Sequence, residues 1–137
     1  MPQILVSFTR KPLEMLSRRR RLVWGRRAKF SINIPIRILV QLQNRADRRG
    51  QPAYVLIEQA LLRASSSRRS FPAWSSRLLA RELENGTKKK TSMITTYHVW
   101  RGSRLRARER GISLEEFVAL SIVLFGLGKK EAQQIGC

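Results

Sequence analysis

The strongest constraint on the fold of this chain is a segment that occurs twice at a fixed offset. The residues Arg45-Ala46-Asp47-Arg48-Arg49-Gly50 return 61 residues later as Arg106-Ala107-Arg108-Glu109-Arg110-Gly111. The same offset places residues 29–34 on residues 90–95 and the apolar run 55–62 on residues 116–123. Three elements that keep one register without a gap predict two related units, and a period above about 50 residues indicates a duplication rather than a solenoid.

Size and charge narrow the kind of partner. A chain of 137 residues suits one ordinary domain or two small, mutually dependent units, and 42% hydrophobic residues can build a core. The net charge of +19 and the pI of about 11.8 make the surface repel itself unless a polyanion neutralises it, and nucleic acid is the usual polyanion. A basic protein without a specific partner is the alternative.

The chain shows no sign of a membrane or an oxidising compartment. Cys137 is the single cysteine, so no internal disulfide can form, which fits a reducing environment. The apolar stretch from Phe117 to Leu127 is shorter than the roughly 20 residues that cross a bilayer, so we expect a buried helix. We also expect no secretory signal, no membrane partner and a cytoplasmic, nucleoid-associated location. The Arg-rich, acid-poor start leaves an organellar transit peptide open as an alternative.

The first repeated unit is expected at residues 29–64. Residues 29–34 alternate polar and apolar side chains, which predicts a strand with one buried face, and Pro35 ends it. Apolar residues at helical spacing lead from there to a stop at Gly50, and Pro52 opens a second helix. Residues 1–28 carry eight Lys or Arg against one acid and are expected to form a basic arm along a phosphate backbone.

The second unit is expected at residues 90–128. Residues 65–89 form a Ser/Arg-rich linker with a short helix from Trp74 to Glu84, and residues 129–137 form a polar tail. The strand at residues 90–95 precedes a less regular helix. The last helix is the clearest, because Ser113 and Glu116 make a Ser-x-x-Glu capping box before an apolar run that ends at Gly126 and Gly128.

Strand, helix, helix at this spacing resembles the ribbon-helix-helix DNA-binding proteins of the Arc, MetJ and CopG type. The resemblance runs without a gap from Lys29 to Leu62 and includes Ala46, Gly50 and Ile57, and two copies in one chain resemble the tandem members. It implies a mainly α fold with a short two-stranded antiparallel β-ribbon. The two ribbon-helix-helix units would then form an intramolecular pseudo-dimer, in which strand 29–34 pairs with strand 90–95.

The resemblance also implies the contacts with DNA. The ribbon would enter the major groove and present its outward residues to base edges, and these are Lys29, Ser31, Asn33, Lys90, Ser92 and Ile94. The N-terminus of each second helix would bind a phosphate through Pro52 and Ala53 in the first unit and Ser113 and Leu114 in the second. The first of these lacks the usual serine, and the second adds Glu115 and Glu116. We expect Arg26 and Arg27 of the arm to be further phosphate contacts.

Enzymatic chemistry is not expected. His98 is the single histidine and has no cysteine near it in sequence, so a tetrahedral zinc site lacks ligands, and no Gly-rich phosphate loop precedes a helix. We therefore expect no cofactor and no metal.

The expected function is sequence-specific binding of double-stranded DNA by a transcriptional repressor or regulator, with assembly of several pseudo-dimers on DNA left open. Two alternatives remain. The first is a relaxosome or partition accessory protein that binds DNA in the same way, and the second is a basic structural protein bound to RNA or the ribosome.

Overall fold

The computed structural model describes residues 27–135, which form a helical fold with one two-stranded antiparallel sheet, as the sequence predicts. The elements follow in the order β1 (Arg27–Pro35), α2 (Ile36–Arg49), α3 (Ala53–Ser66), α4 (Ala73–Asn85), β2 (Lys88–Thr96), α5 (Tyr97–Glu109), α6 (Leu114–Ser121), the π-helix η1 (Ile122–Leu127) and α7 (Gly128–Gln134). The basic arm, apart from Arg27 and Ala28, lies outside the described residues.

The two strands pair antiparallel along their whole length. Ser31 lies opposite Ser92 at the centre of the ladder, and the ladder ends at Arg27 opposite Thr96 and at Pro35 opposite Lys88. In β1 exposed and more buried residues alternate, with Ile32 and Ile34 facing the core. A period of two follows from the pleat, because successive side chains leave a strand on opposite sides.

Chain reversals fix the ends of the first helix in each repeat. Gly50 follows α2 with a φ of 64°, and Gly111 follows α5 and Arg110 with a φ of 70°. This left-handed conformation favours glycine, which has no Cβ to clash with the backbone. The predicted stop at Gly50 is confirmed, and so is the capping box at the start of α6.

The order strand, helix, helix therefore occurs twice with matching bounds. β2 starts and ends 61 residues after β1, and α5 and α6 each start 61 residues after α2 and α3. The offset seen in the sequence is thus the offset of the elements. The expected strands at 29–34 and 90–95 are each longer by two residues at the start, and by one at the end.

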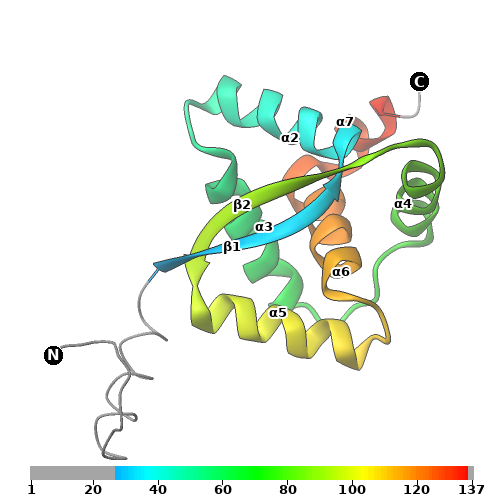
Figure 1. The fold of residues 1–137 in the computed structure, drawn as a ribbon. Coiled ribbons are helices and arrows are strands. Elements are labelled where there is room, and N and C mark those ends of the chain that lie inside the picture. Colours follow the sequence, from blue (N-terminus) through cyan, green and yellow to red (C-terminus); the bar gives the residue numbers. More distant parts are fainter. Residues whose placement is uncertain (1–26, 136–137) are drawn as a thin grey trace, which may run out of the picture.

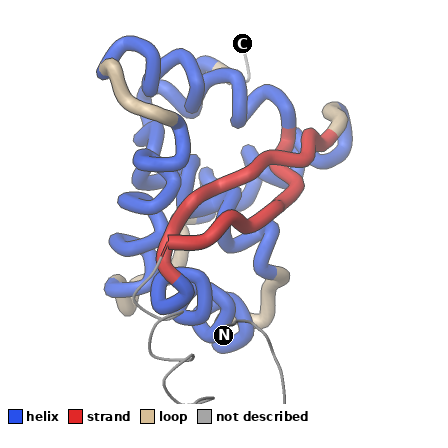
Figure 2. Tube along the Cα trace, turned by 60° about the vertical axis from the view of Figure 1, so that its left-hand side comes forward, coloured by secondary structure: helices blue, strands red, loops and turns tan. Residues whose placement is uncertain are grey.

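The ribbon lies across one side of the helices, with its outer surface uncovered (Figures 1 and 2). Beneath it, each second helix packs against the strand of the other segment, α3 on β2 and α6 on β1. The core contains large apolar side chains from both segments, including Ile34, Leu42, Ile57, Met93 and Phe117. Burial of this shared core stabilises both segments together, because each strand packs on the second helix of the other segment.

The expected linker is attached closely to the core. Helix α4 buries Leu78 and Leu79, and its Glu82 is 1% exposed and lies 3.5 Å from the guanidinium of Arg37 on α2. Arg106 and Arg110 donate hydrogen bonds to the carbonyl oxygens of Ser65 and Ser67, at 2.8 and 3.0 Å. The last turn of α3 and the following loop are therefore held against α5.

The end of the chain differs from the expectation. The last long helix changes from α6 to the π-helix η1 at Ile122 and ends before Gly128, where φ is 84° and where the sequence predicts a stop. Residues 128–134, most of which were expected in a polar tail, form α7 instead, in which Ala132 is buried, as is Ile135 after it. Two apolar residues at helical spacing are enough to attach this short segment to the core.

Among residues 27–135, no single helix is both long and apolar enough to cross a membrane. The helices Tyr97–Glu109 and Leu114–Lys130 pass such a test only as a pair, and they are bent by 105° relative to each other. In the stretch from Phe117 to Leu127, which the sequence predicts to be a buried helix, all residues are buried except Leu124 and Phe125, which are only partly covered.

Candidate nucleic-acid interface

The outer face of the ribbon carries all six residues that the sequence assigned to base contacts. Lys29, Ser31 and Asn33 are exposed on β1, and Lys90 and Ser92 are exposed on β2. Ile94 on the same face is partly covered. The ladder places Lys29 opposite Ile94, Ser31 opposite Ser92, and Asn33 opposite Lys90. The structure thus brings two distant segments into one surface of hydrogen-bonding groups above a buried inner face.

The centre of this surface is symmetric in sequence. Ser31 and Ser92 are opposite each other in the ladder and are also equivalent in the repeat. A two-fold axis between them exchanges Lys29 with Lys90 and Asn33 with Ile94. The outward residues of the two strands therefore differ at one of these three positions, where an amide faces out on β1 and an alkyl group on β2.

Arg27 lies at one end of the ribbon and is held by a carboxylate. Its guanidinium donates two hydrogen bonds to Glu58 on α3, at 2.9 and 3.0 Å, and Glu58 also accepts from the Thr95 hydroxyl at 2.6 Å. The hydrogen bond to Glu58, followed by the attraction between the charges, raises the pKa of Arg27 above its ordinary value. The charge expected to contact phosphate is thus partly neutralised within the protein. Arg26, the other expected contact from the arm, lies outside the described residues.

The N-terminus of α3 is open to an anion. Pro52 is the N-cap residue, no side chain caps the helix, and the first turn contains no acid. The backbone N–H of Val55 donates to the Pro52 carbonyl, while Ala53 and Tyr54 are only partly covered. The first amides of a helix and its dipole favour a negative charge here. This end has the properties that the expected phosphate contact at Pro52 and Ala53 requires.

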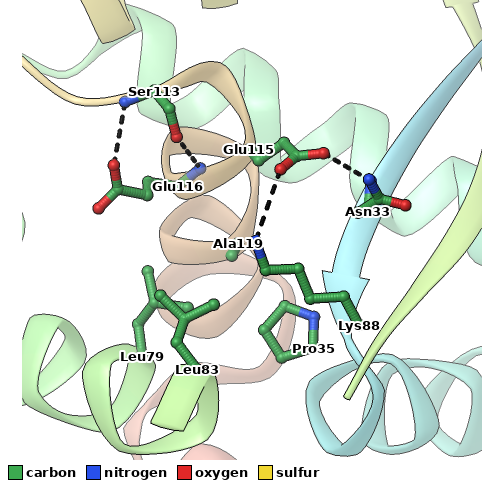
Figure 3. Close-up of a pocket in the computed structure, with 9 residues that line it drawn as sticks. All are labelled: Asn33, Pro35, Leu79, Leu83, Lys88, Ser113, Glu115, Glu116 and Ala119. Carbon is green, nitrogen blue, oxygen red and sulfur yellow. Dashed lines mark hydrogen bonds and ion pairs between the residues drawn. The ribbon is translucent and has the colours of Figure 1, made fainter. Parts of the chain in front are cut away.

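The N-terminus of α6 is already occupied by the protein's own groups. The Ser113 hydroxyl accepts from the Glu116 amide, and the Glu116 carboxylate accepts from the Ser113 amide, each at 3.1 Å. The Glu115 carboxylate accepts a hydrogen bond from the backbone N–H of Asn33 at 3.1 Å and lies 3.8 Å from the Lys88 ammonium (Figure 3). The expected phosphate contact at Ser113 and Leu114 therefore has two carboxylates beside it, which oppose a phosphate.

A basic stripe on α5 was not predicted from the sequence. Arg101, Arg104 and Arg108 are exposed on this helix. Together with Tyr97 and Trp100 they line a shallow pocket with a volume of about 150 Å³. The Trp100 ring stacks on Phe30 of β1 with ring centres 4.5 Å apart, so the stripe begins beside the ribbon. The spacing of these arginines, at i, i+3 and i+7, was the available signal. The equivalent positions on α2 hold Val40, Gln43 and Asp47, so this charge belongs to one half only.

Metal-binding geometry is absent from the part of the chain that the structure describes, where no group of three or more His, Cys, Asp or Glu could hold an ion. Comparisons with protein-family models, with curated proteins and with solved structures found no match. The interface therefore stands on its own geometry.

Proposed function

We propose that this protein binds double-stranded DNA in a sequence-dependent manner by inserting the β1–β2 ribbon into the major groove. The observation that carries the proposal is the face of the ribbon. Lysine, serine and asparagine side chains lie together on an uncovered two-stranded surface whose other side is buried in the core. A two-stranded ribbon fits the major groove, where lysine donates to guanine acceptors and asparagine pairs with adenine.

The two strand-helix-helix segments act as the halves of a ribbon-helix-helix pseudo-dimer. The equal offsets of the elements, the equivalence of Ser31 and Ser92 and the packing of each second helix on the other strand support this arrangement. A protein two-fold axis on the DNA dyad gives a pseudo-palindromic site. Because Asn33 and Ile94 differ, the two half-sites differ at the base pair that these residues contact, with adenine favoured by the amide and a thymine methyl by the alkyl group.

Phosphate contacts differ between the halves. In the first half the open N-terminus of α3 binds phosphate through its free amides. In the second half Glu115 and Glu116 weaken that contact at α6, and the arginine stripe on α5 supplies positive charge beside the ribbon instead. The N-terminal arm adds attraction to DNA that does not depend on sequence, through the seven Lys and Arg among residues 1–26.

The role that fits such a protein best is a transcriptional regulator, most simply a repressor whose site overlaps a promoter. An accessory role in conjugation or partition uses the same binding mode. An RNA-bound structural role fits the charge but not the ribbon, because the major groove of A-form RNA is too deep and narrow to admit it.

The test removes the side chains of one strand. The triple variant Lys29→Ala, Ser31→Ala, Asn33→Ala is compared with the wild type on a duplex enriched from a random pool by the wild type and on a scrambled duplex, at 150 mM salt. We expect the ratio of the two affinities to fall at least about a hundredfold, since each good base contact contributes about 1 to 3 kcal/mol of discrimination.

A matched control variant removes the same three kinds of side chain from positions outside the ribbon. The triple variant Arg77→Ala, Ser76→Ala, Gln59→Ala also loses one cation, one hydroxyl and one amide, all at exposed positions of α3 and α4 outside the two strands. It should keep the specificity ratio. Specific binding that survives in the ribbon variant as well as in the control would show that the ribbon does not contact the bases.

A further inference from the structure

A cavity of about 460 Å³ opens between the loop that follows α3, the π-helix η1 and the end of α5. It lies among the elements that hold the linker to the core, and its lining includes Phe71, Phe125, Leu124, Arg69 and Arg110. We propose that this cavity binds a small organic anion with an aromatic or branched apolar body. The proposal concerns a site separate from the ribbon and does not depend on DNA binding.

The floor of the cavity is apolar and partly aromatic. Phe71 packs edge-on against the buried Phe117, with ring centres 5.6 Å apart, and Leu124 and Phe125 of η1 are only partly covered. Half-exposed apolar side chains around a concave space are the usual lining of small-molecule sites, whose volumes run from about 300 to 1,000 Å³. The floor therefore selects a ligand with an apolar body.

The rim of the cavity is positively charged. Arg110 lies over the Phe71 ring, 4.7 Å from its centre, and donates one hydrogen bond to the Ser67 carbonyl at 3.0 Å. A guanidinium has five N–H donors, so a planar fork remains for a carboxylate or a similar oxyanion. Arg69 adds a second, exposed cation, and no acidic residue is among the residues that line the cavity. The rim therefore selects a negative charge.

The wall formed by η1 is a second, independent feature. A π-helix replaces the ordinary i→i−4 hydrogen bonds with longer ones, is rare, and appears frequently at functional sites. Here it lies in the stretch Ile122–Leu127, and two of its residues, Leu124 and Phe125, face the cavity while Ile122 and Val123 are buried. Leu124 and Phe125 thus give the cavity an apolar wall on the same space that Arg69 and Arg110 line.

These features together favour an amphipathic anion over a simple one. Inorganic phosphate or a DNA phosphate would satisfy Arg110 but would leave the apolar floor in contact with water. A neutral apolar molecule would cover the floor but leave the two cations unpaired. An aromatic carboxylate does both, because its ring meets Phe71 and Phe125 while its carboxylate meets Arg110.

The experiment is a calorimetric titration of the full chain, without nucleic acid, at 150 mM NaCl. The probes are naphthalene-1-carboxylate, its neutral analogue naphthalen-1-ylmethanol, and inorganic phosphate. We expect saturable binding of one carboxylate per chain, with the alcohol at least about tenfold weaker because the charge-assisted contact is lost. Inorganic phosphate, which can also bind at the open N-terminus of α3, should not displace the bound carboxylate.

Two variants locate the binding. Leu124→Trp fills the cavity while keeping both arginines, and Arg110→Gln removes the cation, so each should weaken binding of the carboxylate at least about tenfold. Arg63→Gln removes an exposed cation of α3 that does not line the cavity and should bind as the wild type does. Circular dichroism checks that each variant is folded. Absence of saturable binding to the wild type overturns the proposal, as does equal affinity for the alcohol or unchanged binding in the folded cavity variants.

Discussion

At the scale of single residues, the pair Arg27 and Glu58 shows how a carboxylate of the protein partly neutralises a cation at the end of the ribbon. The Arg27 side chain is 54% exposed at the end of the ribbon, yet both oxygens of the more buried Glu58 accept its hydrogen bonds. This pair raises the pKa of Arg27, so the guanidinium stays charged. The negative charge of Glu58 nevertheless balances part of that positive charge. Removing the carboxylate should therefore free a cation for phosphate.

Glu58→Gln should raise the affinity for duplex DNA and steepen its salt dependence. One additional phosphate contact changes the slope of log K against log salt by about −0.9. The measurement is fluorescence anisotropy at several salt concentrations. Glu84→Gln removes one acid at an exposed position of α4 and serves as the control. Equal slopes in the two variants would contradict a role for Arg27 at the phosphate backbone.

At the scale of elements, much was predictable because the signals are local. Alternation gave the strands, glycine gave the end of α2, and the Ser113 and Glu116 pair gave the start of α6. The bonds that join distant elements were not predictable. Nothing near Arg106 or Arg27 in sequence indicates that their partners are Ser65 and Glu58, because such contacts depend on how the helices pack. The π-helix was not predicted either, because its apolar residues fit an ordinary α-helix equally well.

Two glycines of the second repeat should respond in opposite directions to substitution by alanine. Gly111 has a φ of 70°, where a Cβ is strained, so Gly111→Ala should lower the free energy of unfolding by about 1 kcal/mol. Gly102 lies inside α5, and a Cβ added there would meet no atom within 4 Å, so Gly102→Ala should raise that free energy by about 1 kcal/mol. Urea denaturation measures both. A loss of stability in both variants would show that α5 is not the helix described.

The contact between α2 and α4 gives a further prediction. Arg37 is the basic partner of the buried Glu82 and also donates to the carbonyl of Ile135, beyond α7. Arg37→Met should lower the free energy of unfolding by about 1 to 3 kcal/mol, because Glu82 then stays buried without its cation. Arg77→Met on the exposed side of α4 should change it by less than about 0.5 kcal/mol. Similar small changes in both variants would contradict the structural role of this pair.

At the scale of the whole molecule, charge and symmetry serve different purposes. A net charge of +19 attracts any nucleic acid, and that attraction fades as salt rises. In the proposed binding mode, sequence preference comes from the ribbon, where two strands from equivalent positions of the repeat meet about Ser31 and Ser92. The expected base contacts of the two strands differ only where Asn33 on β1 corresponds to Ile94 on β2. If the ribbon contacts the bases as proposed, the two halves of the preferred DNA site should differ because of this pair.

The most direct test is selection from a random duplex DNA library at 150 mM salt, carried out with the wild type and with the variant Ile94→Asn. The substitution gives both strands the same outward Lys, Ser and Asn. Thermal unfolding of the variant checks that its fold is kept. The account predicts a motif with two related but unequal halves for the wild type and a motif with equal halves for the variant. A motif whose symmetry does not change, or no motif with binding that only fades with salt, would contradict it.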